Sequence, residues 1–126
     1  MNIAFDIDDT ITAIPPLFSA LSRSVRLDGG RVYIVTSRAN NDQVAAQTRK
    51  ELKSYGVEFD ELILIEDQKD LQLQCPHEDL DWYQQYLWQK VRVCLDRDVE
   101  AIFEDDLKVI ELFETYAPQI RVLQVR

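Results

Sequence analysis

The sequence has only two cysteines and one histidine among its 126 residues. Cys75 and Cys94 show neither a C-x-x-C spacing nor a set of histidine partners, which argues against a disulfide framework and against a zinc site. We expect both thiols to be reduced, with Cys94 in the core. The single His77 excludes a histidine-based metal cluster, and its position in a loop after a Cys-Pro pair predicts an exposed side chain.

The sequence also lacks long apolar runs and is poor in basic residues. No window approaches the length of a membrane span, and no basic segment before a long apolar stretch marks a secretory signal. We therefore expect a soluble, cytoplasmic protein with no membrane partner. Fourteen basic residues against 23 acidic ones give a net charge of −9, which argues against a nucleic-acid partner. A bound phosphate would then need local help from a cation, a lysine or backbone N–H groups.

The apolar residues favour one domain that spans residues 1–126. With 46% apolar and 10% aromatic residues, a chain of 126 residues suits one hydrophobic core. Short apolar runs typical of buried strands lie at residues 3–5, 32–35, 62–65, 101–103 and 120–125. Helical segments are predicted at residues 15–28, 41–56, 80–97 and 107–117, with a loop at residues 66–79. This alternation predicts an α/β fold in which a parallel five-stranded sheet lies between two layers of helices.

Helical spacing predicts which side chains face the sheet. The residues selected in this way are Leu17, Leu21, Val25, Val44, Thr48, Leu52, Tyr55, Leu107, Ile110 and Phe113. The segment 80–97 also carries four aromatic residues: Trp82, Tyr83, Tyr86 and Trp88. We expect about half of these to pack in the core, Trp82 and Tyr86 above all. The others would be available to stack on a base or to contact a second subunit.

Polar residues follow three of the five predicted strands. The first strand runs into Asp6 and Asp8, the second into residues 36–38, and the fourth into residues 104–106. Open α/β sheets keep their chemistry at the carboxyl ends of the strands, so we expect these groups to meet. Asp6 and Asp8 would repel each other without a cation nearby, and Mg²⁺, which takes oxygen ligands, is the natural neutraliser.

The residue types fit phosphoryl transfer. Asp6 can act as a nucleophile toward phosphorus and form an aspartyl-phosphate, because a carboxylate is ionised at neutral pH. Asp8 can protonate the leaving oxygen and then deprotonate the attacking water. Asp105 can complete the ligand shell of Mg²⁺, with Glu104 or Asp106 in support.

Two further positions can hold a phosphate group. Thr36 can donate a hydrogen bond to a phosphoryl oxygen, although a strand-end hydroxyl can equally satisfy the backbone. Lys90 can neutralise both the phosphate and Asp6; the alternative is a helical lysine that lies in solvent. Lys69 is the second candidate for the site lysine.

The chain resembles the haloacid dehalogenase-like superfamily of phosphohydrolases in four motifs that occur in the family's order. These motifs are Asp6-Ile7-Asp8-Asp9-Thr10, Val32-Tyr33-Ile34-Val35-Thr36-Ser37-Arg38, Lys90 and Ile102-Phe103-Glu104-Asp105-Asp106. The resemblance implies a Rossmann-like core with strand order 5-4-1-2-3, with Asp6 as nucleophile and Asp8 as acid and base. It also implies Mg²⁺ held by the carboxylates of Asp6 and Asp105 and by the main-chain carbonyl of Asp8.

The same resemblance implies a phosphate-binding set around the nucleophile. Backbone N–H groups just after Asp6 would join Thr36 and Lys90 around the phosphate. Asp9 and Ser37 stand where the family often has glycine. Both positions lie beside the phosphate in the family, so they bear on substrate preference.

Neither interval that could hold a cap domain has room for one. Residues 11–16 are a short link, and residues 66–79 suffice for a loop only. Superfamily members that hydrolyse small metabolites usually carry such a cap, so an open site suggests a macromolecular phosphosubstrate. The other option is a lid supplied by a neighbouring subunit in a homo-oligomer.

We therefore expect a capless, Mg²⁺-dependent phosphatase acting on a phosphorylated small molecule or macromolecule, similar to nucleotidase-like members of the superfamily. Two alternatives remain open. A receiver-like signalling domain would carry its phosphoacceptor after the third strand, near Asp67. A phosphate-binding module without turnover would keep the same polar groups.

Overall fold

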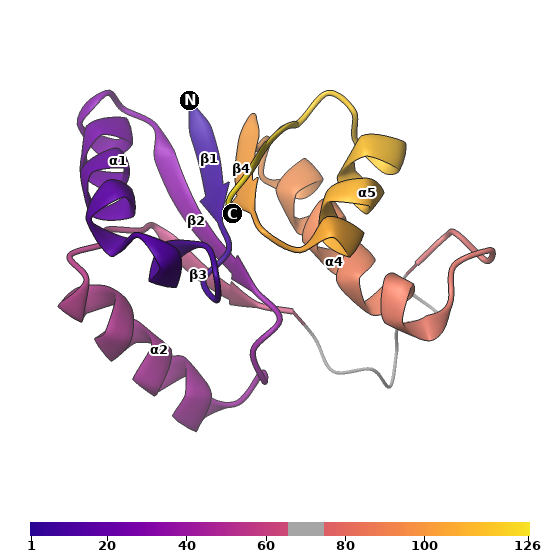
Figure 1. Cartoon of the computed structure of the whole chain (residues 1–126), viewed down its shortest axis with the longest axis horizontal. Coiled ribbons are helices and arrows are strands. Elements are labelled where there is room, and N and C mark those ends of the chain that lie inside the picture. The colour runs from indigo at the N-terminus through magenta and orange to yellow at the C-terminus, as the bar shows by residue number, and fades with distance from the viewer. Residues whose placement is uncertain (66–74) are drawn as a thin grey trace.

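The described part of the chain folds around one sheet of five parallel strands (Figure 1). The computed structural model describes residues 1–65 and 75–126. The strands are β1 (Asn2–Phe5), β2 (Arg31–Thr36), β3 (Glu61–Leu64), β4 (Ala101–Glu104) and β5 (Arg121–Gln124). They lie in the order β3-β2-β1-β4-β5. The predicted α/β fold and the predicted order, read from the opposite edge, are both confirmed.

Strand β1 forms the centre of the sheet. Ala4 pairs with Tyr33 of β2 on one side and with Ile102 of β4 on the other. Ile3, Ala4 and Phe5 are all buried, which explains their continuous apolar run, because a central parallel strand has a packed layer on each face. The strand order reverses between β1 and β4, and ligands of open α/β sheets bind at such a switch point.

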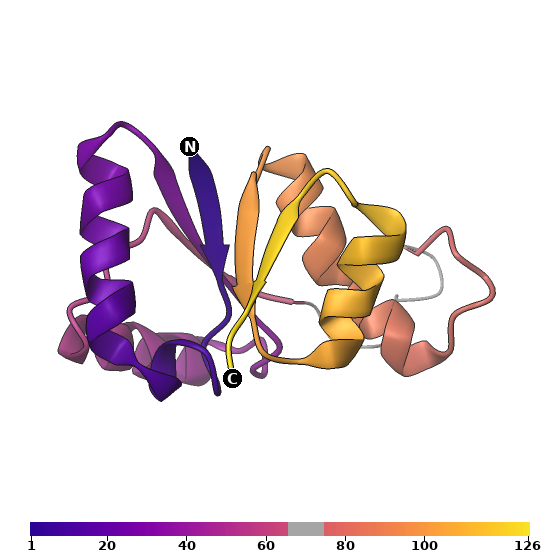
Figure 2. The same ribbon diagram turned by 45° about the horizontal axis from the view of Figure 1, so that its top comes forward.

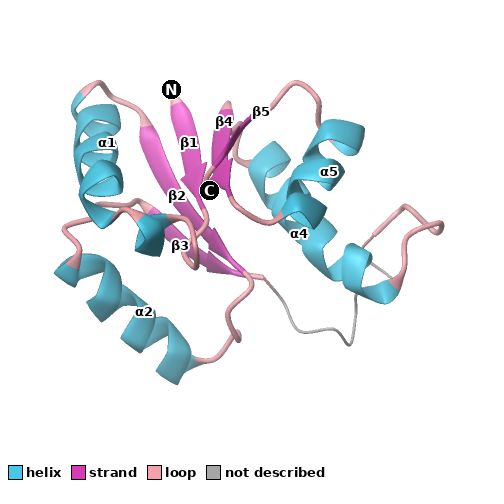
Figure 3. Ribbon diagram, viewed as in Figure 1, coloured by secondary structure: helices cyan, strands magenta, loops and turns pink. Residues whose placement is uncertain are grey.

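Helices cover both faces of the sheet, which gives the three predicted layers (Figures 2 and 3). One face carries α1 (Pro15–Leu27) and α2 (Asp42–Ser54), and the other carries α4 (Trp82–Asp96) and α5 (Leu107–Tyr116). A short 3₁₀ helix, η1 (Ile11–Ala13), joins β1 to α1. On the α1 face, Phe18 lies with its ring centroid 4.9 Å from Phe5 and 5.4 Å from Phe103, in edge-to-face contacts.

Local sequence signals set the helix starts. Pro15 and Pro16 occupy the first positions of α1, where the missing N–H groups need no partner. The Asn41 side chain caps α2, and Asp81 with Gln84 forms a reciprocal capping box at α4. Helices α2 and α4 therefore begin at side chains that satisfy their first backbone donors.

Three residues predicted to face the core are instead exposed. Leu17, Trp82 and Leu107 are 43%, 57% and 66% exposed. Each lies in the first turn of its helix, and a helix that runs antiparallel to the strands begins at the carboxyl edge of the sheet, where it has little sheet to cover. The prediction for these three was wrong, whereas Thr48, Leu52, Ile110 and Phe113 are buried as predicted.

The two cysteines and the single histidine are all at least partly buried. Cys75 and Cys94 are both free and buried, and burial raises the pKa of Cys94 to about 12. His77 is half-buried rather than exposed, because its ring stacks on Tyr116 with centroids 3.8 Å apart. Among residues 1–65 and 75–126, no helix is long and apolar enough to cross a membrane.

The architecture differs from that of a receiver-like domain and contains no cap in the described residues. Receiver-like domains have the strand order 2-1-3-4-5, which differs from the order found in this sheet. The segment 11–16 holds only η1 and the start of α1, and residues 75–79 contain neither helix nor strand. In the part of the chain that is described, the sheet and its helices are therefore the whole fold, without a cap. Asp67 lies outside the described residues.

Candidate active site

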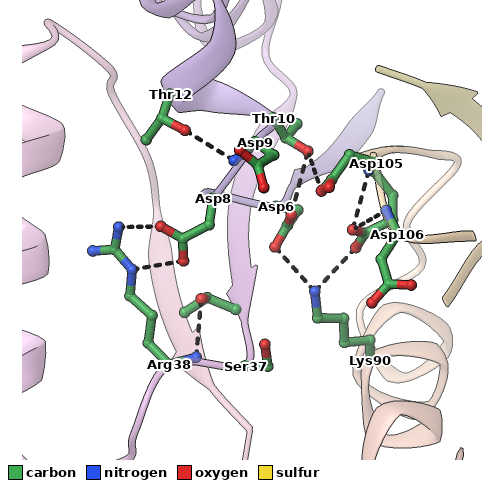
Figure 4. Close-up of polar contacts among 12 residues, drawn as sticks. Asp6, Asp8, Asp9, Thr10, Thr12, Ser37, Arg38, Lys90, Asp105 and Asp106 are labelled. Carbon is green, nitrogen blue, oxygen red and sulfur yellow. Dashed lines mark hydrogen bonds and ion pairs between the residues drawn. The ribbon is translucent and has the colours of Figure 1, made fainter. Parts of the chain in front are cut away.

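Most of the predicted site residues meet at the carboxyl ends of β1 and β4. A small open cavity of about 170 Å³ lies there, at the switch point of the sheet. Its lining residues are Asp6, Asp8, Asp9, Ser37, Leu87, Lys90, Glu104, Asp105 and Asp106. Segments distant in the sequence thus contribute to one cleft (Figure 4).

Asp6 is held at the centre of this cleft. Its backbone N–H donates to the carbonyl oxygen of Phe103 at 3.0 Å, which extends the β1–β4 ladder by one residue. The residue is only 6% exposed, and Oδ1 accepts a hydrogen bond from Nζ of Lys90 at 3.0 Å. The strand end therefore fixes the backbone while the lysine orients the carboxylate.

Lys90 lies between two carboxylates. Its ammonium group is 3.0 Å from Asp6 Oδ1 and 3.0 Å from Glu104 Oε2, and the residue is 2% exposed. Burial disfavours the charged form, but the two carboxylates outweigh this effect and raise the pKa of Lys90. Lys90 is thus a buried, charged lysine at the site rather than a solvent-exposed one. Lys69, the second candidate, lies outside the described residues.

Glu104 supports the site from the end of β4. One oxygen, Oε2, accepts from Lys90, while Oε1 accepts the backbone N–H groups of Asp105 and Asp106 at 3.1 and 3.2 Å. The side chain is fully buried. Both oxygens are therefore engaged in fixing the lysine and the turn that leads into α5. Asp106 begins that helix by accepting the backbone N–H of Lys108.

Thr10 joins Asp6 to Asp105, a role that sequence reasoning missed. Its buried hydroxyl lies 3.2 Å from Asp6 Oδ2 and 3.1 Å from Asp105 Oδ1. Burial raises the pKa of Asp6 and the pKa of Asp105. The contact with Asp6 raises the pKa of Asp105 further, whereas the positive charge of Lys90 lowers the pKa of Asp6. The position of Thr10 in the first motif, four residues after Asp6, could have indicated this role.

The acidic cluster has the chemistry of a site for a hard cation. One carboxylate oxygen from each of Asp6, Glu104 and Asp105 lies within 4.8 Å of the other two. Together with Lys90 these residues leave an excess of negative charge, which a divalent ion would neutralise. Glu104 is fully buried and accepts three hydrogen bonds from Lys90 and the β4–α5 turn, more than Asp6 or Asp105 accepts, so Asp6 and Asp105 fit best as direct ligands. Asp106 lines the same cavity but is not part of this three-residue cluster.

Asp8 lines the cavity, but its carboxylate points away from Asp6 (Figure 4). It forms a two-point contact with Arg38, with Nη2–Oδ1 at 2.8 Å and Nε–Oδ2 at 3.1 Å. The hydrogen bonds from Arg38 lower the pKa of Asp8, so its ionised form is favoured. On its other side, Arg38 donates from Nη1 to Glu51 at 2.6 Å and to Thr48 at 3.1 Å. Arg38 is a second residue to which the sequence analysis assigned no role.

The remaining predicted phosphate ligands differ in their placement. Ser37 lines the cavity, whereas Thr36 is buried and is not among the lining residues; its hydroxyl oxygen accepts the backbone N–H of Arg38 at 3.2 Å. Asp9 also lines the cavity, and its φ of 60° places it in the left-handed region that favours glycine. Its backbone N–H is engaged by the Thr12 hydroxyl at 2.9 Å.

Comparisons with known proteins support the fold. No protein-family model matches the chain, and no curated protein matches its sequence. Among solved structures, a chain of the Pnkp1/Rnl/Hen1 complex is similar, with a TM-score of 0.65 and 17% identity over 98% of this chain. A chain of the Pnkp1/Rnl/Hen1 RNA repair complex is similar with a TM-score of 0.65 and 13% identity, again over 98% of this chain. The present chain spans only 45% and 42% of those two chains.

The two carboxylates on Arg38 make the stability effect of this residue depend on pH. Their pKa values are lowered from ordinary values of 3.8 for Asp8 and 4.5 for Glu51, so their pairing stabilises the fold fully above those values. This stabilisation is lost as the pH falls through the lowered values. We expect Arg38→Ala to cost about 1 kcal/mol at pH 7, since the pairs are partly screened by solvent, and clearly less at pH 3.5.

Urea unfolding at the two pH values measures this difference. Arg97→Ala is the matched comparison, because Arg97 makes a similar two-point contact at 2.8 and 2.7 Å with a single carboxylate of the described residues, Glu61. A cost for Arg38→Ala that does not exceed that of Arg97→Ala, or that stays constant with pH, would contradict the prediction.

Removal of the buried ammonium should destabilise the protein strongly. Lys90→Met leaves Asp6 and Glu104 buried without their shared cation, and breaking a buried ion pair in this way costs roughly 3–5 kcal/mol. Adding Glu104→Gln to Lys90→Met should recover part of the loss. Thermal and urea unfolding measure both effects. Lys50→Met on the exposed side of α2 is the control and should be near neutral; a similar small effect at Lys90 would refute the ionic role.

Proposed function

We propose that the chain is a Mg²⁺-dependent phosphomonoesterase that forms an aspartyl-phosphate on Asp6. The observation that carries this proposal is the buried Asp6 carboxylate. It accepts a hydrogen bond from Lys90 at 3.0 Å and is linked to the Asp105 carboxylate by the hydroxyl of Thr10. A carboxylate in this position needs no base to act as a nucleophile. Its lysine partner supplies positive charge where an anionic phosphoryl group would approach.

Two half-reactions follow from these residues. In the first, an Asp6 oxygen forms a bond to phosphorus while the ester P–O bond breaks and the leaving oxygen takes a proton. In the second, water attacks the phosphorus of the aspartyl-phosphate, and Asp6 leaves as a carboxylate with release of inorganic phosphate. Lys90 faces negative charge in both steps, and its raised pKa keeps it charged throughout.

The acidic cluster would hold the metal ion. Asp6 and Asp105 would bind Mg²⁺ directly, and Glu104 would keep Lys90 and the β4–α5 turn in place. When bound, Mg²⁺ would neutralise the repulsion between the carboxylates and an incoming phosphate. Thr10 would hold the two ligand side chains in position.

Asp8 is the group for proton transfer in this proposal. Arg38 keeps it ionised, and the ionised form is the one that accepts a proton from the attacking water. Donation to a leaving oxygen requires Asp8 to turn from Arg38 and to take up a proton first. Arg38 therefore favours the base role of Asp8 over its acid role.

Nucleotides and related phosphomonoesters are the substrates we favour. The −9 charge of the chain opposes long polyanions, and the open cleft suits an exposed phosphate end. The two solved structures described above are Pnkp1/Rnl/Hen1 complexes, and one of these is named an RNA repair complex. A single phosphorylated nucleotide is consistent with the negative charge of the chain and with these similarities.

An activity assay separates this enzyme from a phosphate-binding module without turnover. The wild-type chain should hydrolyse an aryl phosphate with Mg²⁺ and fail to do so in chelator. Asp6→Asn should fold normally by circular dichroism and lose roughly 10³-fold or more of the rate. Asp28→Asn, at an exposed carboxylate after α1, is the control and should keep full activity. Turnover that survives in Asp6→Asn would remove the proposed nucleophile.

Magnesium should stabilise the folded chain more at high pH than at low pH. The pKa values of Asp6 and Asp105 are raised, so protons compete with the ion on the acid side. We expect the increase in melting temperature caused by Mg²⁺ to be larger at pH 7.5 than at pH 5. Asp105→Asn should lose most of this increase and Asp28→Asn none. Equal increases at both pH values would contradict competition at these carboxyls.

A further inference from the structure

Three aromatic side chains line the outer part of α4. Trp82 is 57% exposed and Tyr83 37% exposed, and Tyr86 is half-buried. The Trp82 and Tyr83 rings meet edge to face with centroids 5.8 Å apart, and the Tyr83 and Tyr86 rings are nearly parallel at 6.3 Å. We call these three residues the aromatic platform.

The platform is fixed to both sides of the candidate active site. The Tyr86 hydroxyl donates to the backbone carbonyl of Ser37 at 2.9 Å, and Ser37 lines the cavity. Tyr83 lies under the ammonium group of Lys108, which is 5.1 Å from the ring centroid. The backbone N–H of Lys108 in turn donates to Asp106, which also lines the cavity. The platform therefore borders the mouth of the cleft.

The helix places the platform at a defined distance from the buried lysine. Tyr86 lies one helical turn before Lys90, and Trp82 lies one turn further, so these residues share one side of α4. Eight residues of α-helix span roughly 12 Å. A ligand whose phosphate lies at Lys90 can thus extend its other end toward Trp82 over a distance comparable with the length of a nucleotide.

Core packing does not account for the exposed part of the platform. The fourth aromatic of this helix, Trp88, is 7% exposed and belongs to the core, whereas most of the Trp82 side chain faces solvent. Exposed aromatic surface beside a polar cleft is typical of a binding site. Planar aromatic rings next to a lysine suit a ligand that is itself planar, aromatic and attached to an anionic group.

We propose that Trp82 and Tyr83 form a stacking subsite for the base of a mononucleotide whose phosphate binds at Asp6 and Lys90. This inference rests on the proposed phosphatase function and adds the substrate class to it. The reaction converts a nucleoside monophosphate and water into a nucleoside and inorganic phosphate. The ester P–O bond breaks, its oxygen leaves as a nucleoside hydroxyl after taking a proton, and the water oxygen remains on the phosphate. The −9 charge favours the free mononucleotide over a nucleic-acid strand.

Kinetics with two substrates that differ only in the base test this subsite. Adenosine 5′-monophosphate and ribose 5-phosphate share the phosphate and sugar. We expect Trp82→Ala and Tyr83→Ala to lower kcat/KM for the nucleotide roughly 5- to 100-fold and to leave that for ribose 5-phosphate unchanged. Trp82→Phe should restore most of the nucleotide activity and Trp82→Leu should not, because only an aromatic ring stacks.

The matched control is Leu95→Ala, further along α4. Leu95 is 37% exposed, like Tyr83, but lies at the opposite end of the helix. It should change neither substrate's kcat/KM. Equal losses on both substrates in Trp82→Ala, or no loss on either, would overturn the stacking subsite. A 3′-phosphorylated oligonucleotide that is hydrolysed more efficiently than any mononucleotide would overturn the choice of the free nucleotide.

A binding measurement separates failure of the subsite from failure of the phosphatase proposal. In Asp6→Asn with Mg²⁺, adenosine 5′-monophosphate should quench the fluorescence of the exposed Trp82, while the buried Trp88 supplies a constant background. Ribose 5-phosphate should not quench. Quenching without hydrolysis in wild type would keep the subsite and remove the enzyme. Hydrolysis in wild type without quenching would keep the enzyme and remove the subsite.

Discussion

The contact of one buried ammonium group with two buried carboxylates organises this end of the molecule. Lys90 reaches from α4 to the ends of β1 and β4, where Asp6 and Glu104 accept its hydrogen bonds. Three charges out of water are costly unless each is paired, so the helix and both strands are bound to one geometry. Glu104 extends this constraint to the turn that starts α5, through the backbone N–H groups it accepts.

A second ionic network keeps the two aspartates of the first motif apart. Asp6 is buried and faces Lys90, whereas Asp8 is on the exposed side and faces Arg38. Arg38 also contacts Glu51, so Asp8 is linked to α2 while Asp6 is linked to α4 and β4. Two carboxylates separated by one residue thus have opposite changes in pKa, raised for Asp6 and lowered for Asp8. Two carboxyl groups whose pKa values differ in this way can take different roles in proton transfer and nucleophilic attack.

The sequence was sufficient for the fold and for the meeting of most site residues. Apolar runs and helical periodicity repeat along the whole chain, and parallel strands bring their polar ends to one edge. Asp6 and Asp105 could be placed together for this reason, whereas Lys90, on helix α4, was assigned to the site from its charge and from the family resemblance. The orientation of Asp8 could not, because it depends on Arg38 and on the helix that holds Glu51. The prediction of core residues also failed at Leu17, Trp82 and Leu107, since neither helical spacing nor residue type tells whether the sheet reaches that turn.

A single rigid element carries both Lys90 and Trp82. In the proposed binding mode, the spacing between the phosphate at Lys90 and the outermost aromatic ring is therefore counted in helical turns and does not depend on loop motion. In that binding mode, the spacing of two residues on one helix sets the distance between the two ends of the ligand. An inserted residue between the two positions would rotate the ring by about 100° and move it to another side of α4.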